Sequence, residues 1–224
     1  MKKALFFDLD GTLWDARKSL VESYNLTMEK LGLGYRFDFA MVNSYMGLTP
    51  LETVKLAFKD ICFDDNGNEI EENIQKGLEI FKKMVKDEIE YLSLRPGSLY
   101  PNEEETLEKL SKKYKLYIVS NAEKGYIENF LNCYPNIARF ISGKLCAGDT
   151  NLDKRDNIKL LMSQKRIKKV FYIGDTDKDR IESLHAGVDF IYASYGFGTI
   201  ENNNIKYLIK DLPSLIDVLK LADN

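Results

Sequence analysis

The segment Phe6–Leu13, which reads FFDLDGTL, gives the strongest indication of the fold. A short apolar run, Ala4–Leu9, leads directly into two carboxylates, Asp8 and Asp10, and then into a glycine. Residues two apart on a strand point to the same side, so both carboxylates would emerge together where the strand ends. In a parallel sheet, ligands bind at that carboxyl end of the strands. The segment therefore predicts a buried strand with an acidic site at its end.

Further apolar runs predict the rest of the sheet. Runs without clean alternation suit strands that are covered on both faces. We expect such strands at Ala4–Leu9, Leu116–Ser120, Leu145–Ala147, Val170–Gly174 and Phe190–Ala193, with a weaker one at Lys206–Ile209. Helical patterns separate these runs, and this alternation indicates an α/β fold with a doubly wound, mainly parallel sheet.

The interval from residue 16 to residue 93 departs from this alternation. It reads as one helix after another, and its longest apolar stripe runs from Ile70 to Ile89 at spacings of three and four. No strand signal appears again before Leu116. We therefore expect a core made of residues 1–15 and 94–224, with an all-helical cap of residues 16–93 inserted after the first strand.

Composition excludes several classes of protein. The chain has 224 residues, of which 44% are hydrophobic and 30% charged, which is near the globular average. A net charge of −3 does not fit a nucleic-acid binder, and no apolar run approaches the roughly 20 residues that a membrane helix needs. Three widely spaced cysteines give neither a disulfide framework nor a zinc pattern. We expect a cytoplasmic protein, as a monomer or weak homodimer, with no nucleic-acid or membrane partner.

The two carboxylates suit phosphoryl transfer. Like charges as close as those of Asp8 and Asp10 are unfavourable unless a cation neutralises them or one carboxyl holds a proton. One carboxylate can attack phosphorus, while the other, protonated, gives a proton to the leaving oxygen and later activates water. Gly11 lets the backbone turn sharply and approach a ligand.

A second apolar run also ends in acids. In the segment Tyr172–Asp179, YIGDTDKD, Asp175 would point into the same crevice, and Asp179 would lie about one turn into the next helix. Mg²⁺ prefers oxygen ligands and takes few of them from the protein. Asp8, Asp175 and the backbone carbonyl of Asp10 would form such a site.

Two weaker signals would serve a phosphate group. Ser120, followed by Asn121, ends a predicted strand with a hydroxyl that can donate to phosphate oxygen. Lys154 precedes a helix that we expect to begin near Asp156, and a cation there would offset the charge on the nucleophile and the phosphoryl group. The phosphate-binding set that we predict is Gly11, Thr12, Ser120, Asn121 and Lys154.

With these residues in place, the chain resembles the haloacid dehalogenase-like hydrolase superfamily. The matching pieces follow the order of the family along nearly the whole chain: Asp8–Thr12, Ser120, Lys154, and Gly174–Asp175 with Asp179. The helical interval resembles the family's cap. The segments Leu99–Pro101 and Tyr195–Gly198 resemble its phosphoglycolate-phosphatase-like branch.

The resemblance implies a Rossmann-like core, a phosphoaspartyl intermediate on Asp8 and Asp10 as general acid and base. It implies phosphate bound by Ser120 and Lys154. It further implies a magnesium site with the following residues: Asp8, Asp10 and Asp175 as ligands, and Asp179 in support. Many relatives have proline after the lysine, whereas Arg155 stands here, so Arg155 and Lys159 are alternatives for the basic role.

The function that we expect is a Mg²⁺-dependent phosphatase, a hydrolase that acts on a small-molecule phosphate ester. Asp10 is the second acid that dehalogenases of this superfamily lack, and it excludes dehalogenation. One alternative is a phosphomutase similar to β-phosphoglucomutase, with Arg36 or Lys55 contributing sugar-phosphate contacts. Another is a non-enzymatic phosphoacceptor signalling module, although Asp10 and the inserted cap argue against it.

Overall fold

The computed structural model describes residues 3–200 and 205–222 and divides the chain into two compact units. The core unit contains residues 1–15 and 98–224, and the helical unit contains residues 16–97. We expect the chain to return to the core at residue 94, whereas residues 94–97 cluster with the helical unit.

The core unit is built on a six-stranded sheet whose order is β5-β4-β1-β6-β7-β8. Every pairing in this sheet is parallel, which confirms the predicted doubly wound α/β fold. The strands are β1 (Lys3–Phe7), β4 (Lys115–Ser120), β5 (Ile141–Cys146), β6 (Lys169–Gly174), β7 (Asp189–Ala193) and β8 (Leu208–Ile209). The first strand stops two residues before the predicted end, because Leu9 already accepts the turn hydrogen bonds of the loop that follows.

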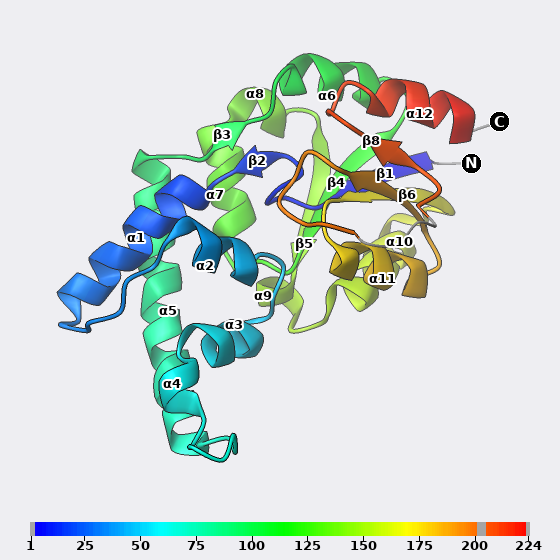
Figure 1. Cartoon of the computed structure of the whole chain (residues 1–224). Coiled ribbons are helices and arrows are strands. Elements are labelled where there is room, and N and C mark those ends of the chain that lie inside the picture. The colour runs from blue at the N-terminus through cyan, green and yellow to red at the C-terminus, as the bar shows by residue number, and fades with distance from the viewer. Residues whose placement is uncertain (1–2, 201–204, 223–224) are drawn as a thin grey trace. The chain divides into compact units, whose positions relative to one another are not determined.

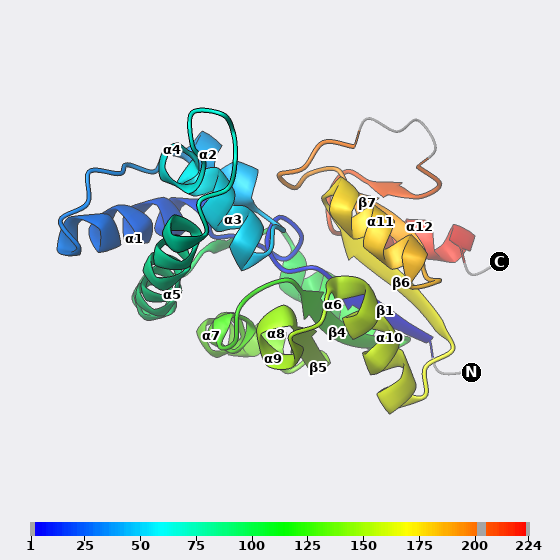
Figure 2. The same ribbon diagram turned by 90° about the horizontal axis from the view of Figure 1, so that it is seen from below.

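Helices cover both faces of this sheet. Figures 1 and 2 show α10 and α11 on one face of the sheet and α6 and α12 on the other. The helices of the core unit are α6 (Glu103–Ser111), α7 (Tyr126–Cys133), α8 (Pro135–Ala138), α9 (Ala147–Thr150), α10 (Lys154–Lys165), α11 (Asp177–His185) and α12 (Leu215–Ala222). Helix α10 begins at Lys154, two residues before the predicted start, because the carboxylate of Asp153 caps it by accepting from the Asp156 N–H at 2.8 Å.

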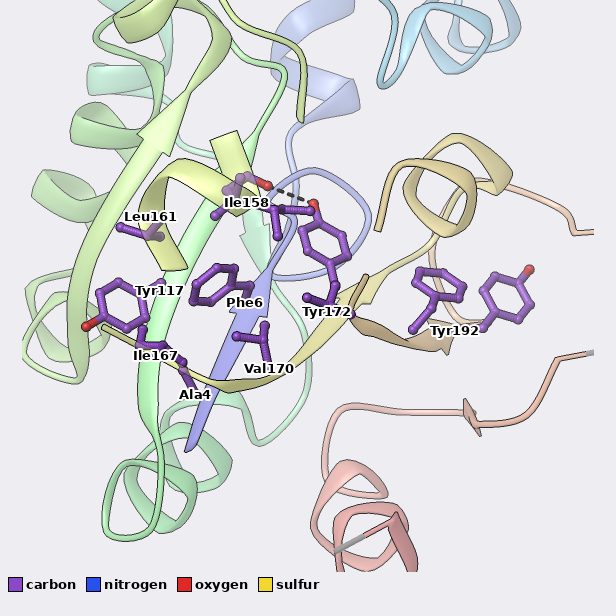
Figure 3. Packing of buried hydrophobic residues seen from close by; sticks show 12 residues of the cluster. Ala4, Phe6, Tyr117, Ile158, Leu161, Ile167, Val170, Tyr172 and Tyr192 are labelled. Atoms are coloured by element: carbon purple, nitrogen blue, oxygen red, sulfur yellow. Dashed lines mark hydrogen bonds between the residues drawn. The ribbon is translucent and has the colours of Figure 1, made fainter. Parts of the chain in front are cut away.

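Aromatic and aliphatic side chains bind α10 to the sheet. Figure 3 shows Ile158 and Leu161 of α10 above the strands that carry Phe6 and Tyr172. All four side chains are 2% exposed or less, so their burial removes apolar area from water, which is the main favourable contribution to folding. The Tyr172 hydroxyl is not left unsatisfied, since it donates to the Val119 carbonyl at 2.7 Å.

A two-stranded antiparallel ribbon completes the core unit. It pairs β2 (Trp14–Asp15) with β3 (Ser98–Leu99), the two segments at which the chain leaves the core unit and returns to it. We did not predict this ribbon, because strands of two residues are too short to produce a periodic pattern.

The helical unit contains no strand among its described elements. Its helices are α1 (Arg17–Lys30), α2 (Phe39–Tyr45), α3 (Pro50–Ala57), α4 (Lys59–Cys62) and α5 (Glu71–Leu94). The long stripe predicted from Ile70 to Ile89 lies on α5 from Ile74 onward. Ile74 is buried, but farther along the helix the buried apolar residues are Met84 and Leu92, which are not part of the stripe. Within the described residues, no helix combines the length and the apolar character needed to cross a membrane.

Candidate active site

The first acidic motif lies where β1 ends. Asp8 follows the last strand residue, and its N–H still donates to the carbonyl of Ile173 in β6 at 2.8 Å. The chain then turns, and the N–H groups of Leu13 and Trp14 both donate to the Leu9 carbonyl. Asp8 is only 4% exposed, so the pairing with β6 presents a buried carboxylate at the carboxyl edge of the sheet.

Strand register brings the other motifs to the same edge. Phe7 pairs with Ile118 in β4 and with Ile173 in β6. Ser120 and Asp175 each lie two residues beyond these partners. The predicted motifs therefore gather around the central strand, as parallel pairing requires.

Lys154 is the cation of this group. It is the first residue of α10 and is 1% exposed. Its Nζ lies 3.0 Å from Oδ1 of Asp8 and also forms an ion pair with Oδ1 of Asp179. Arg155 instead binds Asp153 and Asp156, and Lys159 is exposed. Of the three basic candidates, Lys154 is the one that lies against Asp8.

The carboxylate of Asp179 is fixed by the start of α11. Thr176 caps this helix, and its hydroxyl accepts from the Asp179 N–H while donating to Asp179 Oδ2 at 2.7 Å. The Thr176 N–H also donates to Oδ2, at 3.1 Å. These reciprocal bonds form a capping box, which leaves Oδ1 to face Lys154.

Asp175 presents one oxygen without a partner. Its Oδ2 accepts from the N–H groups of Phe197 at 2.7 Å and Gly198 at 3.2 Å. Its Oδ1 is buried and has no hydrogen-bond partner in the described structure. Gly11, with φ +77°, and Gly196 pass so close that a Cβ on either would overlap Asp175. An orphaned, buried carboxylate oxygen is costly unless it binds a ligand.

The acids of this site are suited to a divalent cation. One oxygen each from Asp8, Asp175 and Asp179 lie within 4.8 Å of one another, and no other such group of three or more His, Cys, Asp or Glu residues occurs in the described residues. Carboxylate oxygens are the ligands that Mg²⁺ prefers. The unpartnered Oδ1 of Asp175 fits such an ion. Asp10, which we predicted as a ligand through its backbone carbonyl, does not add its side chain to this cluster.

Burial and repulsion from neighbouring acids raise the pKa of both Asp8 and Asp175. Burial, with repulsion from Asp179, raises the pKa of Asp8 to about 6, although Lys154 acts in the opposite direction. Burial, with repulsion from Asp179 and Asp8, raises the pKa of Asp175 to about 8. Burial would lower the pKa of Lys154, but attraction to Asp179 and Asp8 outweighs it and raises this pKa above its usual value. The surplus of negative groups therefore favours either bound protons or a bound cation.

Asp10 is held apart from this cluster by two donors. The Trp14 indole Nε1 and the Tyr126 hydroxyl each donate to its Oδ1 at 2.9 Å. Burial and the charge of Asp8 raise the pKa of Asp10 to about 7, and the two hydrogen bonds limit the rise. An acid with a pKa near neutrality is suited to exchanging protons during turnover.

The residues predicted to hold phosphate differ in their surroundings. Ser120 is 5% exposed, and its Oγ accepts from the Ala122 N–H at 3.3 Å. Asn121 is 7% exposed and lies next to it. The hydroxyl of Thr12 is fully buried and has no hydrogen-bond partner among the described residues, while the Thr12 carbonyl accepts from the Tyr195 hydroxyl at 2.8 Å.

Four contacts of this site were not predicted from the sequence. Trp14 is four residues from Asp10, but Tyr126 is 116 residues away, and nothing local in the sequence connects them. The Phe197 and Gly198 N–H groups belong to the Tyr195–Gly198 segment, to which we assigned a family resemblance but no role. The glycines of that segment were its available signal, since they permit close backbone approach.

Comparison with known proteins agrees with this geometry. Residues 5–193 match the sequence model of the haloacid dehalogenase-like hydrolase family. The phosphoglycolate phosphatase of Aquifex aeolicus is 27% identical to this chain, over 99% of the chain and 97% of the relative. That of Vibrio parahaemolyticus is 24% identical, over 98% and 97% respectively.

Solved structures share the fold. A haloacid dehalogenase-like family hydrolase of Streptococcus pneumoniae superposes with a TM-score of 0.76 at 22% identity, over 97% of this chain and 98% of that one. Together with the family match over residues 5–193, this establishes that the chain belongs to the haloacid dehalogenase-like hydrolase family and confirms the predicted resemblance.

Proposed function

We propose that this hydrolase is a Mg²⁺-dependent phosphatase of small phosphomonoesters that forms a phosphoaspartyl intermediate on Asp8. The observation that carries the proposal is the buried Asp8 carboxylate, paired with Lys154 at 3.0 Å and clustered with Asp175 and Asp179. A carboxylate held in this way at the carboxyl edge of the sheet can act as a nucleophile toward phosphorus.

The proposed reaction divides between two acids. An oxygen of Asp8 attacks phosphorus, and the bond from phosphorus to the ester oxygen breaks. Asp10 gives its proton to the departing ester oxygen, and it then takes a proton from the water that hydrolyses the phosphoaspartate. Lys154 and the Ser120 hydroxyl would bind the phosphoryl oxygens.

A magnesium ion would be held by Asp8 and Asp175, with the Asp10 carbonyl as a further ligand and Asp179 as an additional acid beside it. When bound, it would neutralise the negative charge on the carboxylates and the phosphoryl group. The support in this chain is the cluster of three buried carboxylates and the orphaned Oδ1 of Asp175.

Phosphoglycolate is the first substrate that we would test. The support is similarity along nearly the whole chain to proteins named phosphoglycolate phosphatase, such as that of Aquifex aeolicus. Because folds do not fix substrates, the proposal extends only to small phosphate esters as a class. We also propose a cytoplasmic setting and a monomer or weak homodimer. The cytoplasmic setting is supported by Cys62 and Cys146, which are buried thiols.

Released phosphate provides the test. We expect phosphate release from a panel of phosphorylated metabolites with Mg²⁺, and loss of that release with EDTA or in Asp8→Asn. Asp177→Asn is a matched control, because this acid lies in the same segment but pairs with Arg180 at the surface. Turnover that persists in Asp8→Asn contradicts the mechanism. Interconversion of phosphate isomers without phosphate release would identify a phosphomutase instead.

A further inference from the structure

Two aromatic side chains, those of Trp14 and Tyr126, donate hydrogen bonds to the same oxygen of Asp10. We propose that Trp14 and Tyr126 are positioning residues that commit Oδ1 of Asp10 as an acceptor, so that proton transfer takes place at Oδ2. The inference rests on the proposed phosphatase function, in which Asp10 exchanges the protons. Both donors lie 2.9 Å from Oδ1, and the described structure gives this carboxyl no other hydrogen bond.

Trp14 is fixed by its backbone as well as its ring. It is fully buried and pairs with Leu99 in the β2–β3 ribbon. Its carbonyl accepts from the Gly11 N–H at 3.0 Å, and its own N–H donates to Leu9. The indole is thus attached to the same turn that carries Asp10, and it cannot move independently of that turn.

Tyr126 contacts Asp10 although it lies 116 residues further along the chain. It is the first residue of α7 and is 4% exposed. Its ring meets the Trp14 ring edge to face at 5.5 Å, and Phe130, one turn further along α7, meets Trp14 in the same way at 5.1 Å. The two donors therefore belong to one packed aromatic cluster, which limits the rotamers of both.

The chemistry of the donors decides which oxygen is available. An indole N–H has no lone pair and can only donate, so Oδ1 must accept from Trp14 at every stage of the reaction. The hydroxyl oxygen of a carboxylic acid is the poorer acceptor, so the proton of neutral Asp10 belongs on Oδ2. The Tyr126 hydroxyl adds a second donor to Oδ1 and reinforces the same assignment.

Each step then has a defined proton path. When the oxygen of Asp8 bonds to phosphorus, the electron pair of the broken ester bond stays on the ester oxygen, which takes the proton from Oδ2 and leaves as an alcohol. When water attacks the phosphoaspartate, its proton goes to Oδ2, and the broken bond returns its electron pair to Asp8. The cycle consumes one water, releases alcohol and phosphate, and restores both carboxyl groups.

A leaving-group comparison separates positioning from mere packing. Alkyl phosphates such as phosphoglycolate need a proton on the leaving oxygen, whereas the phenolate of p-nitrophenyl phosphate leaves without one. In single-turnover release of the alcohol or phenol, we expect Tyr126→Phe to lower the alkyl rate by about 10- to 100-fold and the aryl rate by much less. Asp10→Asn should show the same pattern.

One control variant and the wild-type protein make the outcome decisive. Phe130→Leu disturbs the same aromatic cluster without removing a donor to Asp10, so it should lower both rates alike or neither. Equal losses on alkyl and aryl substrates in Tyr126→Phe would overturn the positioning role. A wild-type protein that releases neither product would instead contradict the proposed phosphatase.

A spectroscopic measurement tests the contact without any turnover. Trp14 is the only tryptophan in the chain, so its indole N–H gives a single signal in an ¹⁵N-correlated NMR spectrum. We expect this signal to lose its hydrogen-bonded downfield shift in Asp10→Ala and to keep it in Asp177→Asn. A signal that stays in place in Asp10→Ala would show that the indole does not bind Asp10 and would overturn the inference.

Discussion

Glu103 is a buried acid outside the site, and it should make stability depend on pH. It is the first residue of α6 and is 2% exposed. Its Oε2 accepts from the Tyr100 N–H at 3.2 Å, while its Oε1 is buried with no hydrogen-bond partner among the described residues. Burial raises the pKa of Glu103 from 4.5 to about 9, and the hydrogen bond from Tyr100 acts in the opposite direction.

The size of the effect follows from linkage between protons and folding. Between pH 4.5 and about pH 9, the folded chain holds one proton on Glu103 that the unfolded chain has released. The contribution to stability is therefore fully present below the unfolded pKa and is lost as pH rises toward the folded pKa. Each pH unit in this window lowers the free energy of unfolding by about 1.4 kcal/mol, which gives about 2.7 kcal/mol between pH 6 and pH 8.

Glu103→Gln is the variant that isolates this contribution, since it keeps the shape and the acceptor but cannot titrate. We expect the free energy of unfolding of Glu103→Gln to rise relative to that of the wild type by about 1.4 kcal/mol for each pH unit. Urea unfolding at pH 6, 7 and 8 measures this difference. Glu104→Gln controls for the loss of a charge from the same turn, because Glu104 is exposed and pairs with Arg139. Parallel curves of stability against pH for the wild type and Glu103→Gln would refute the reasoning.

Three further substitutions test close contacts. Gly11→Ala should lower kcat by about 10- to 100-fold while the protein stays folded, because a Cβ would displace the Asp175 carboxylate, and an unchanged kcat would contradict this. Gly77→Ala should lower the free energy of unfolding by about 1–3 kcal/mol in urea, since its Cβ would lie 2.5 Å from Cγ1 of Val54, and a stabilised protein would show that helix propensity outweighs the overlap. Thr176→Val should cost about 1–2 kcal/mol by the same assay, whereas Thr176→Ser, which keeps the cap of α11, should cost much less.

The parts of the fold that could be predicted are those with a sustained pattern. Strands such as β6, Lys169–Gly174, lie between two layers of helices. Because both faces of such a strand are covered, it appears in the sequence as a continuous apolar run that can be recognised. On α5 the periodicity predicts a helix but not which line of residues is buried. Ile74, Met84 and Leu92 are covered, while Leu78 and Val85 of the predicted stripe are only half-buried. The covered line depends on how neighbouring helices pack, and a single stripe does not encode that.

The same distinction holds in the candidate site. Asp8 and Asp175 could be placed together, because acids that end parallel strands meet at one edge of the sheet. The geometric cluster takes in the side chain of Asp179 rather than that of Asp10. The Asp10 carboxylate instead accepts hydrogen bonds from Trp14 and Tyr126, and Tyr126 lies 116 residues from Asp10 in the sequence. A contact of that length leaves no local trace in the sequence.

The basic residue shows how helix packing, and not motif order alone, sets the charge balance of the site. Lys154, Arg155 and Lys159 lie within about one and a half helical turns of one another. The order of the motifs along the chain does not by itself show which of the three faces Asp8. In the structure the Arg155 N–H donates to Oε2 of Glu182 at 2.8 Å, which ties the start of α10 to α11. That tie brings Lys154 against Asp179, the acid that α11 itself holds by its capping box. The cation that faces Asp8 is therefore chosen by the contact between two helices on the same face of the sheet.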